Sequence, residues 1–458
     1  MTRLKKEKTK LEAFSDRVIA VLNKRLNRPF IQFVCLLVLA VYLLAFALTF
    51  ATSKGGRTIF GPFLGADFGA FYVAGKIFNA ERAAQIYDRA LHHQKYLEQF
   101  PDAVPDTQLP YVNAPFFILP FAILARLPYS WAYLFWVIIS LGLYLAGFAL
   151  IWKTLDAIPR DAWSVALLLS LSFMPFLVEC LAGGQTSAIG FFFIALAISL
   201  ERRGQYFLSG LVLAVCSYKP TLLLLIAPML FITRRYRTVA GAAIGGGILA
   251  LVSFLVVGAE GCRAYVNVLL YFKDASTSST SGLLSWKYVD VNSFFRLLLG
   301  GHTQLRWIMT AAAFAIGLPL LLREWWRSSV NDEVQPAMVW ALTITATLVL
   351  NVYLGIYDST LVVLSALMTT DCVLGARASR PQRAERREVT GAFRESSNDR
   401  KSLPASYQII LLCVYVVPWL TQPLARLTHV QLFTLVLAGF GVWQLVQLQS
   451  NRGNRLAS

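Results

Sequence analysis

Long apolar runs separated by short polar segments constrain this chain more than any other feature of its sequence. The first run, Phe30–Phe50, holds no charged residue and is long enough to cross the hydrocarbon core of a bilayer as one helix. Similar runs recur along the chain, and 57% of its 458 residues are hydrophobic. Backbone polar groups inside a bilayer must find partners within the segment, which favours helices. The sequence therefore predicts an all-α polytopic membrane protein.

We expect a bundle of about twelve transmembrane helices. Loops between alternate runs carry Lys and Arg, as in 153–161, 201–205, 233–237 and 323–335, and basic loops stay on the cytoplasmic side of a membrane. Loss of one span would invert this pattern, so an even count with both termini in the cytoplasm fits best. The predicted spans are 30–50, 131–152, 163–181, a fourth from the Gly184 turn to Glu201, 206–218, 220–233, 239–257, 306–322, 336–350, 354–374, 406–425 and 429–449.

This topology divides the chain into four segments. The N-terminal segment is rich in Lys and Arg, and a second polar stretch before the last two spans is rich in Arg. Both are predicted to be cytoplasmic. The segments are a basic N-terminal segment 1–29, a membrane-embedded module 30–374, an Arg-rich linker 375–404, and a C-terminal transmembrane pair with its tail, 405–458.

Two long loops, 51–130 and 258–304, fall on the outer side of the predicted topology. Residues 68–80 and 83–99 have helix-compatible patterns of aromatic and charged residues, which favour amphipathic helices lying at the membrane interface. Residues 113–128 are apolar but short and broken by prolines, so we expect a re-entrant or interfacial hairpin. No N-x-S/T sequon occurs, which fits a bacterial inner membrane with these loops in the periplasm.

The composition also argues against several classes of function. The net charge is +17, but the basic residues lie mostly in short segments between apolar runs, which indicates topology and contact with anionic lipid. No basic stripe with interleaved aromatics appears, so nucleic-acid binding is not expected. The six cysteines include no CxxC spacing and the four histidines no HxxxH spacing. We therefore expect neither a metal site nor a cofactor.

Polar residues from distant parts of the chain are assigned to one leaflet, and charged groups at membrane depth are costly and usually functional. Asp67 has an N-cap as its structural alternative, Glu179 a neighbouring cation, and Lys219 a contact with lipid headgroups. Pro220 breaks the helix beside Lys219, and such breaks line cavities or lie buried. The residues assigned to the outer side are Asp67, Glu179, Gln185, Lys219, Lys287, Asp290, Asn292, Tyr357 and Asp358.

The order of several short motifs resembles glycosyltransferase family 87, whose members are multi-spanning enzymes of the GT-C type. The resemblance covers roughly residues 60–360. Two departures are Ser187, where the family commonly has Asn, and the absence of a His just before Tyr357. The motifs are Gly65-Ala66-Asp67-Phe68-Gly69-Ala70-Phe71-Tyr72, Ile86-Tyr87-Asp88, Tyr111 to Pro115 with Pro120 and Leu127-Pro128, Gly184-Gln185-Thr186-Ser187, Gly210-Leu211 with Lys219-Pro220, Asp290-Val291-Asn292-Ser293 and Tyr357-Asp358.

The resemblance implies a GT-C-like bundle that transfers a sugar, such as mannose or arabinofuranose, from a polyprenyl-phosphate donor to a glycolipid or envelope glycan. By resemblance, Asp67 is the general base. A fixed cation would neutralise the leaving phosphate without a metal, and we assign this role to Lys219, assisted by Lys287 or Arg126. Contacts with sugar or acceptor are assigned to Tyr72, Glu179, Gln185, Trp286, Tyr288, Asp290, Asn292, Tyr357 and Asp358.

Three other functions compete with sugar transfer at this stage. A transporter or flippase of lipid-linked sugars would also have twelve spans, a broken helix and buried acids, although it leaves the two long outer loops unexplained. A ligase or polymerase of envelope glycans differs in its donor. A purely structural membrane protein would leave the outer polar residues without a purpose.

Overall fold

The computed structural model describes residues 27–53, 56–58, 64–80, 83–101, 110–277, 284–330, 336–378 and 403–456. Most of the predicted basic segment 1–29 and of the Arg-rich linker 375–404 lies outside these residues. Within the described chain every regular element is a helix, and Tyr288 and Gly355 form an isolated antiparallel bridge. The prediction of an all-α protein is therefore confirmed for this part of the chain.

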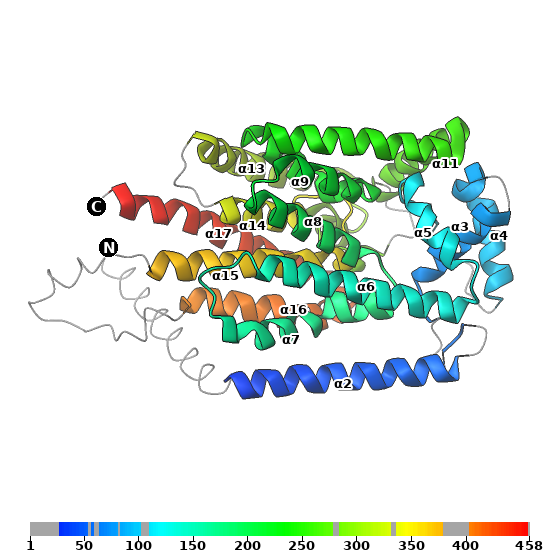
Figure 1. The fold of residues 1–458 in the computed structure, drawn as a ribbon, viewed down its shortest axis with the longest axis horizontal. Coiled ribbons are helices and arrows are strands. Elements are labelled where there is room, and N and C mark those ends of the chain that lie inside the picture. The colour runs from blue at the N-terminus through cyan, green and yellow to red at the C-terminus, as the bar shows by residue number, and fades with distance from the viewer. Residues whose placement is uncertain are drawn as a thin grey trace, which may run out of the picture.

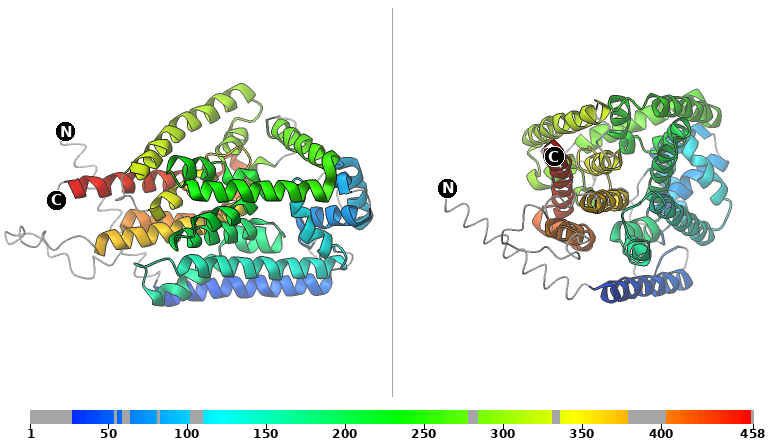
Figure 2. Two further views of the ribbon diagram at one scale, coloured as in Figure 1. Left: turned by 45° about the horizontal axis from the view of Figure 1, so that its top comes forward. Right: turned by 60° about the vertical axis from the view of Figure 1, so that its left-hand side comes forward.

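Long helices form a bundle whose members lie side by side (Figures 1 and 2). Shorter helices and single turns fill the space between them and cover one end. The long helices are α2 (Arg28–Thr52), α6 (Tyr129–Trp152), α11 (Tyr236–Thr277), α13 (Thr303–Val330), α15 (Val362–Ala378), α16 (Ala405–Thr428) and α17 (Leu432–Leu456). The shorter helices are α3 (Phe68–Ala80), α4 (Arg89–Gln99), α5 (Ile118–Leu124), α7 (Trp163–Leu171), α8 (Ser187–Arg202), α9 (Tyr206–Leu213), α10 (Ile226–Ile232), α12 (Val291–Leu299) and α14 (Pro336–Val349).

Seven of the described helices are long and apolar enough to cross a membrane. An eighth crossing is possible where Arg160–Leu171 and Pro175–Ala182 meet at a bend of 53°. The predicted spans 206–218, 220–233 and 336–350 correspond to shorter apolar helices. The structure is thus that of a multi-pass membrane protein, while the count of twelve stays a prediction.

The outer loops fold largely as the sequence indicates. The predicted helix 68–80 is α3, and 83–99 is a 3₁₀ turn, Ala83–Tyr87, followed by α4. Asp88 caps α4 by accepting hydrogen bonds from the backbone N–H groups of Ala90 and Leu91 at 2.9 and 3.0 Å. Helices α3, α4 and α5 gather at the end of the bundle opposite the start of α2 and the end of α17 (Figure 1).

Helix α11 breaks where the predicted span 239–257 ends and the second outer loop begins. Gly258 has φ 70° and ψ −177°, a conformation that only glycine adopts without strain. The chain after it continues as a helix in another direction (Figure 2). Gly258 therefore marks the boundary between span and loop that the hydropathy pattern predicts.

The C-terminal pair, α16 and α17, is joined to the bundle by buried polar contacts. Gln444 of α17 is fully buried, and its side-chain amide donates to the hydroxyls of Ser365 and Thr369 on α15, each at 2.8 Å. Ser365 also shares a 2.7 Å hydrogen bond with Thr345 of α14. Interhelical hydrogen bonds of this kind hold helices together where the hydrophobic effect between them is weak.

Candidate active site

Asp67 lies at the start of α3, partly exposed, and is held by a turn from a distant part of the chain. The side-chain amide of Gln185 donates to its Oδ2 at 2.6 Å, and the backbone N–H of Asp67 donates to the carbonyl of Gly183 at 3.0 Å. The Asp67 carboxylate thus pairs with Gln185 instead of capping α3, which was its structural alternative. A partly exposed carboxylate with one oxygen fixed keeps the other available for a substrate.

The turn that carries Gln185 has a conformation set by Gly184. This residue has φ +75°, and a Cβ atom there would lie 2.5 Å from the Cβ of Phe68. The indole N–H of Trp136 donates to the Gly184 carbonyl at 3.1 Å, and the Tyr133 hydroxyl donates to the carbonyl of Ala182 at 2.9 Å. The turn follows a π-helix, Pro175–Ala182, a rare winding that often occurs at functional sites.

Lys219 occupies the break between two short 3₁₀ turns, Ala214–Tyr218 and Pro220–Leu223. Its ammonium forms a salt bridge with Asp358, donates to the Tyr357 hydroxyl at 3.3 Å and lies 4.4 Å from the centroid of the Tyr357 ring. The side chains of Lys219 and Asp358 are 13% and 1% exposed. Lys219 therefore points into the bundle instead of reaching toward lipid headgroups.

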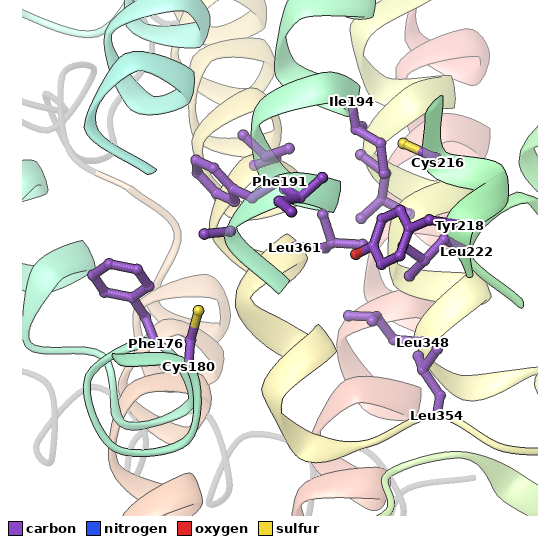
Figure 3. Packing of buried hydrophobic residues seen from close by; sticks show 14 of the residues in the cluster. Phe176, Cys180, Phe191, Ile194, Cys216, Tyr218, Leu222, Leu348, Leu354 and Leu361 are labelled. Atoms are coloured by element: carbon purple, nitrogen blue, oxygen red, sulfur yellow. The ribbon is translucent and has the colours of Figure 1, made fainter. Parts of the chain in front are cut away.

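Apolar packing supports the break at Lys219 and connects it to the Gly184 turn. The Tyr218 hydroxyl donates to the carbonyl of Thr186 at 3.1 Å, and the Tyr218 ring stacks on Phe117 with centroids 4.4 Å apart. Figure 3 shows Tyr218 beside Leu222 and Leu361 within this buried cluster. The Gly184 turn and the break at Lys219 are therefore both packed against the same buried side chain, that of Tyr218.

The second outer loop is fastened to the connection between α14 and α15. The Val289 N–H donates to the Leu354 carbonyl at 3.0 Å, and the Asn292 amide donates to the Val352 carbonyl at 2.9 Å. Asp290 is fully buried and accepts from the N–H and hydroxyl of Ser293 and from the N–H of Leu354. Burial raises the pKa of Asp290 to about 6. Asp290 and Asn292 thus hold the loop in place.

The C-terminal pair also reaches this region, a contribution that no sequence feature indicated. Gln422 of α16 donates to the Glu179 carboxylate at 2.6 Å, so Glu179 has an amide as its partner instead of the cation considered above. Gln431, just before α17, donates to the Trp286 carbonyl at 2.6 Å. The guanidinium of Arg426 lies 3.7 Å from the centroid of the Trp286 ring.

Tyrosine side chains make further direct contacts among these elements. Tyr357 contacts Lys219 directly. Tyr288 is buried, and its hydroxyl hydrogen-bonds that of Tyr353 at 2.6 Å.

Two of the predicted site residues lie apart from these contacts. Tyr72 is 2% exposed, and its hydroxyl donates to the Leu127 carbonyl at 2.8 Å, so it packs α3 against the end of α5. Arg126 lies on the exposed turn after α5. Their roles with substrate stay predictions. In the described part of the chain, no three His, Cys, Asp or Glu side chains are gathered as metal ligands.

The fold and the site define a class: a multi-pass membrane protein with a partly exposed carboxylate held by one helix-breaking turn, and a lysine buried in an ion pair at a second helix break. The sequence model of glycosyltransferase family 87 matches residues 111–351, more than half of the chain. The chain belongs to glycosyltransferase family 87, which confirms the resemblance, and it is therefore a membrane glycosyltransferase. The match begins after Asp67 and ends before Tyr357. No curated protein and no solved structure matches the chain.

Proposed function

We propose that this enzyme transfers a sugar from a polyprenyl-phosphate donor to a hydroxyl of a glycolipid or envelope glycan, with inversion at the anomeric carbon and Asp67 as general base. The observation that supports this most is the Asp67 carboxylate, which is partly exposed and held by Gln185 at 2.6 Å. The proposal includes twelve spans and a site on the outer face of a bacterial inner membrane.

The reaction is a single displacement. Asp67 takes the proton of the acceptor hydroxyl while the oxygen attacks the anomeric carbon. The bond from that carbon to the acceptor oxygen forms as the bond to the phosphate oxygen breaks. The phosphate leaves with the electron pair and gains one negative charge. One carboxylate is enough for this chemistry, because no covalent sugar–enzyme intermediate is formed.

The remaining groups of the site are proposed to bind and orient the two substrates. Lys219, fixed by Asp358 and Tyr357, would face the leaving phosphate together with Lys287, and preorganised positive charge at that point lowers the barrier. Arg126 would assist from its exposed turn. Contacts with the sugar or the acceptor are assigned, as in the sequence analysis, to Tyr72, Glu179, Gln185, Trp286, Tyr288, Asp290, Asn292, Tyr357 and Asp358.

The test uses the purified full-length protein in lipid nanodiscs with defined polyprenyl-phosphate sugars and a membrane glycolipid acceptor, with products identified by mass spectrometry. Asp67→Asn keeps the size of the side chain and its contact with Gln185 but removes the base, so we expect transfer to fall by about a hundredfold or more. Asp156, an exposed carboxylate in the loop after α6, provides the matched control Asp156→Asn, which should retain full activity.

Two results would reject the proposed function. Substantial transfer by Asp67→Asn would remove Asp67 from the role of base. Movement of the lipid-linked sugar across vesicle membranes without any transfer product would favour a flippase.

A further inference from the structure

Two cations near the site lie over one aromatic ring, that of Trp286. The Lys287 Nζ is 5.6 Å and the Arg426 guanidinium carbon 3.7 Å from its centroid. The charge of Lys219 is neutralised by Asp358. Among the described residues, neither Lys287 nor Arg426 forms a salt bridge. Two cations on one aromatic ring that form no salt bridge are suited to an anionic ligand.

The backbone of Trp286 is held in place by buried polar groups that belong to the C-terminal pair. Gln431 is fully buried and donates to the Trp286 carbonyl at 2.6 Å, and its own side-chain oxygen accepts a hydrogen bond from the hydroxyl of Thr421. The Thr421 oxygen also accepts from the backbone N–H of Phe433 at 3.1 Å. In this series of hydrogen bonds, the side chains of Gln431 and Thr421 both have partners. The series fixes the position of the Trp286 backbone relative to α16.

The same face of α16 also contacts the region around Asp67. Gln422 precedes Arg426 by four residues, so both side chains lie on one face of the helix. Gln422 donates to Glu179 at 2.6 Å, and Glu179 lies on the π-helix that leads into the turn carrying Gln185, the partner of Asp67. The face of α16 that carries Arg426 therefore contacts the π-helix next to the Gln185–Asp67 pair.

We propose that Arg426 and Lys287, arranged on Trp286, form a binding site for a lipid phosphate. This assignment rests on the proposed function, in which the ligand is the phosphate that joins the sugar to the isoprenoid. The guanidinium offers two parallel N–H donors to phosphate oxygens, and the ring holds its plane in a fixed orientation. The charge that the phosphate gains on leaving is met by two cations that form no salt bridge among the described residues.

The test measures binding, not catalysis. Farnesyl phosphate is titrated onto the full-length protein in phosphatidylcholine nanodiscs, with farnesol as the probe that lacks the phosphate. We expect Arg426→Gln and Lys287→Gln each to weaken binding of farnesyl phosphate by about tenfold or more, the effect of losing a hydrogen bond to a charged group. Binding of farnesol should not change. The matched control is Arg263→Gln, which alters an exposed arginine of α11 outside the site.

Unchanged binding of farnesyl phosphate by both variants would overturn the proposal. Displacement of farnesyl phosphate by an equal concentration of phosphatidylglycerol, lost in Arg426→Gln, would overturn its assignment to the donor, because the site would then hold bulk lipid headgroups. Asp67→Asn separates the two proposals. If it transfers sugar, the base assignment fails while the binding result stands. If it is inactive and Arg426→Gln binds normally, only the phosphate site fails.

Discussion

Replacement of either partner in the Lys219–Asp358 pair should destabilise the protein, and by unequal amounts. Breaking a buried ion pair by removing one partner costs about 3–5 kcal/mol, because the other charge stays buried. In Asp358→Asn, Lys219 is 13% exposed and keeps its contacts with the hydroxyl and ring of Tyr357. These contacts recover about 1–2 kcal/mol. We expect a net loss of about 2–3 kcal/mol for this variant.

Lys219→Met should be worse tolerated than Asp358→Asn. It leaves the Asp358 carboxylate 1% exposed, and Oδ1 of that group has no hydrogen-bond partner among the described residues. The full cost of about 3–5 kcal/mol is then expected. The double variant carries no buried charge at this position, so its loss should fall at least 2 kcal/mol short of the sum of the single losses, on the order of coupling found for contacting residues.

The measurement is the free energy of unfolding of the two single variants and the double variant in the same mixed micelles. Losses that add in the double variant to within about 0.5 kcal/mol would refute the coupling. A larger loss for Asp358→Asn than for Lys219→Met would refute the role given to Tyr357.

Two further predictions concern the Gly184 turn and the second outer loop. Gly184→Ala should lower the stability of the protein more than Gly204→Ala. Both residues have φ near +75°, where an alanine has about 1–2 kcal/mol of backbone strain, but only at Gly184 would the added Cβ meet Phe68. Equal melting temperatures of the two variants would contradict this close contact. For Asp290, the pKa is about 6 in the fold against 3.8 ordinarily, so the folded protein retains a proton that the unfolded chain has lost. The free energy of unfolding should therefore fall as the pH rises from about 4 to 6, and Asp290→Asn should remove this pH dependence. A wild-type thermal unfolding midpoint that does not change over that pH range would contradict the prediction.

Hydropathy and charge predicted the parts of the fold that are encoded locally. Helix α3 begins and ends at the predicted residues, and α11 breaks at Gly258, directly after the predicted span. Each prediction used local sequence. For α3 it was a helical pattern of aromatic residues, and for the break in α11 it was the end of an apolar run, where Gly258 lies. The helices at 206–218 and 220–232 are shorter than a full span, and composition alone does not determine how far into a bilayer such helices reach.

The sequence singled out several polar residues for which the structure shows specific contacts, but it did not predict which groups they contact. Asp67, Gln185, Lys219 and Asp358 stood out because each is polar at a level where polarity is costly. That Lys219 pairs with Asp358 depends on how two broken helices pack, which periodicity does not encode. Gln422, Gln431 and Arg426 gave no signal, because the last two spans follow a long polar stretch and nothing local shows against which helices they pack.

The contacts of the last two helices bear on where this enzyme ends as a working unit. The family match stops at residue 351, yet Gln444 fastens α17 to α15 and Gln431 fixes the backbone of Trp286 from beyond that point. A shortened version cut at residue 351 would keep every recognisable motif of the matched segment and lose the contacts that α16 and α17 make with Glu179, Trp286 and α15. For this protein, the segment matched by the family model is therefore shorter than the segment whose contacts hold the candidate site together.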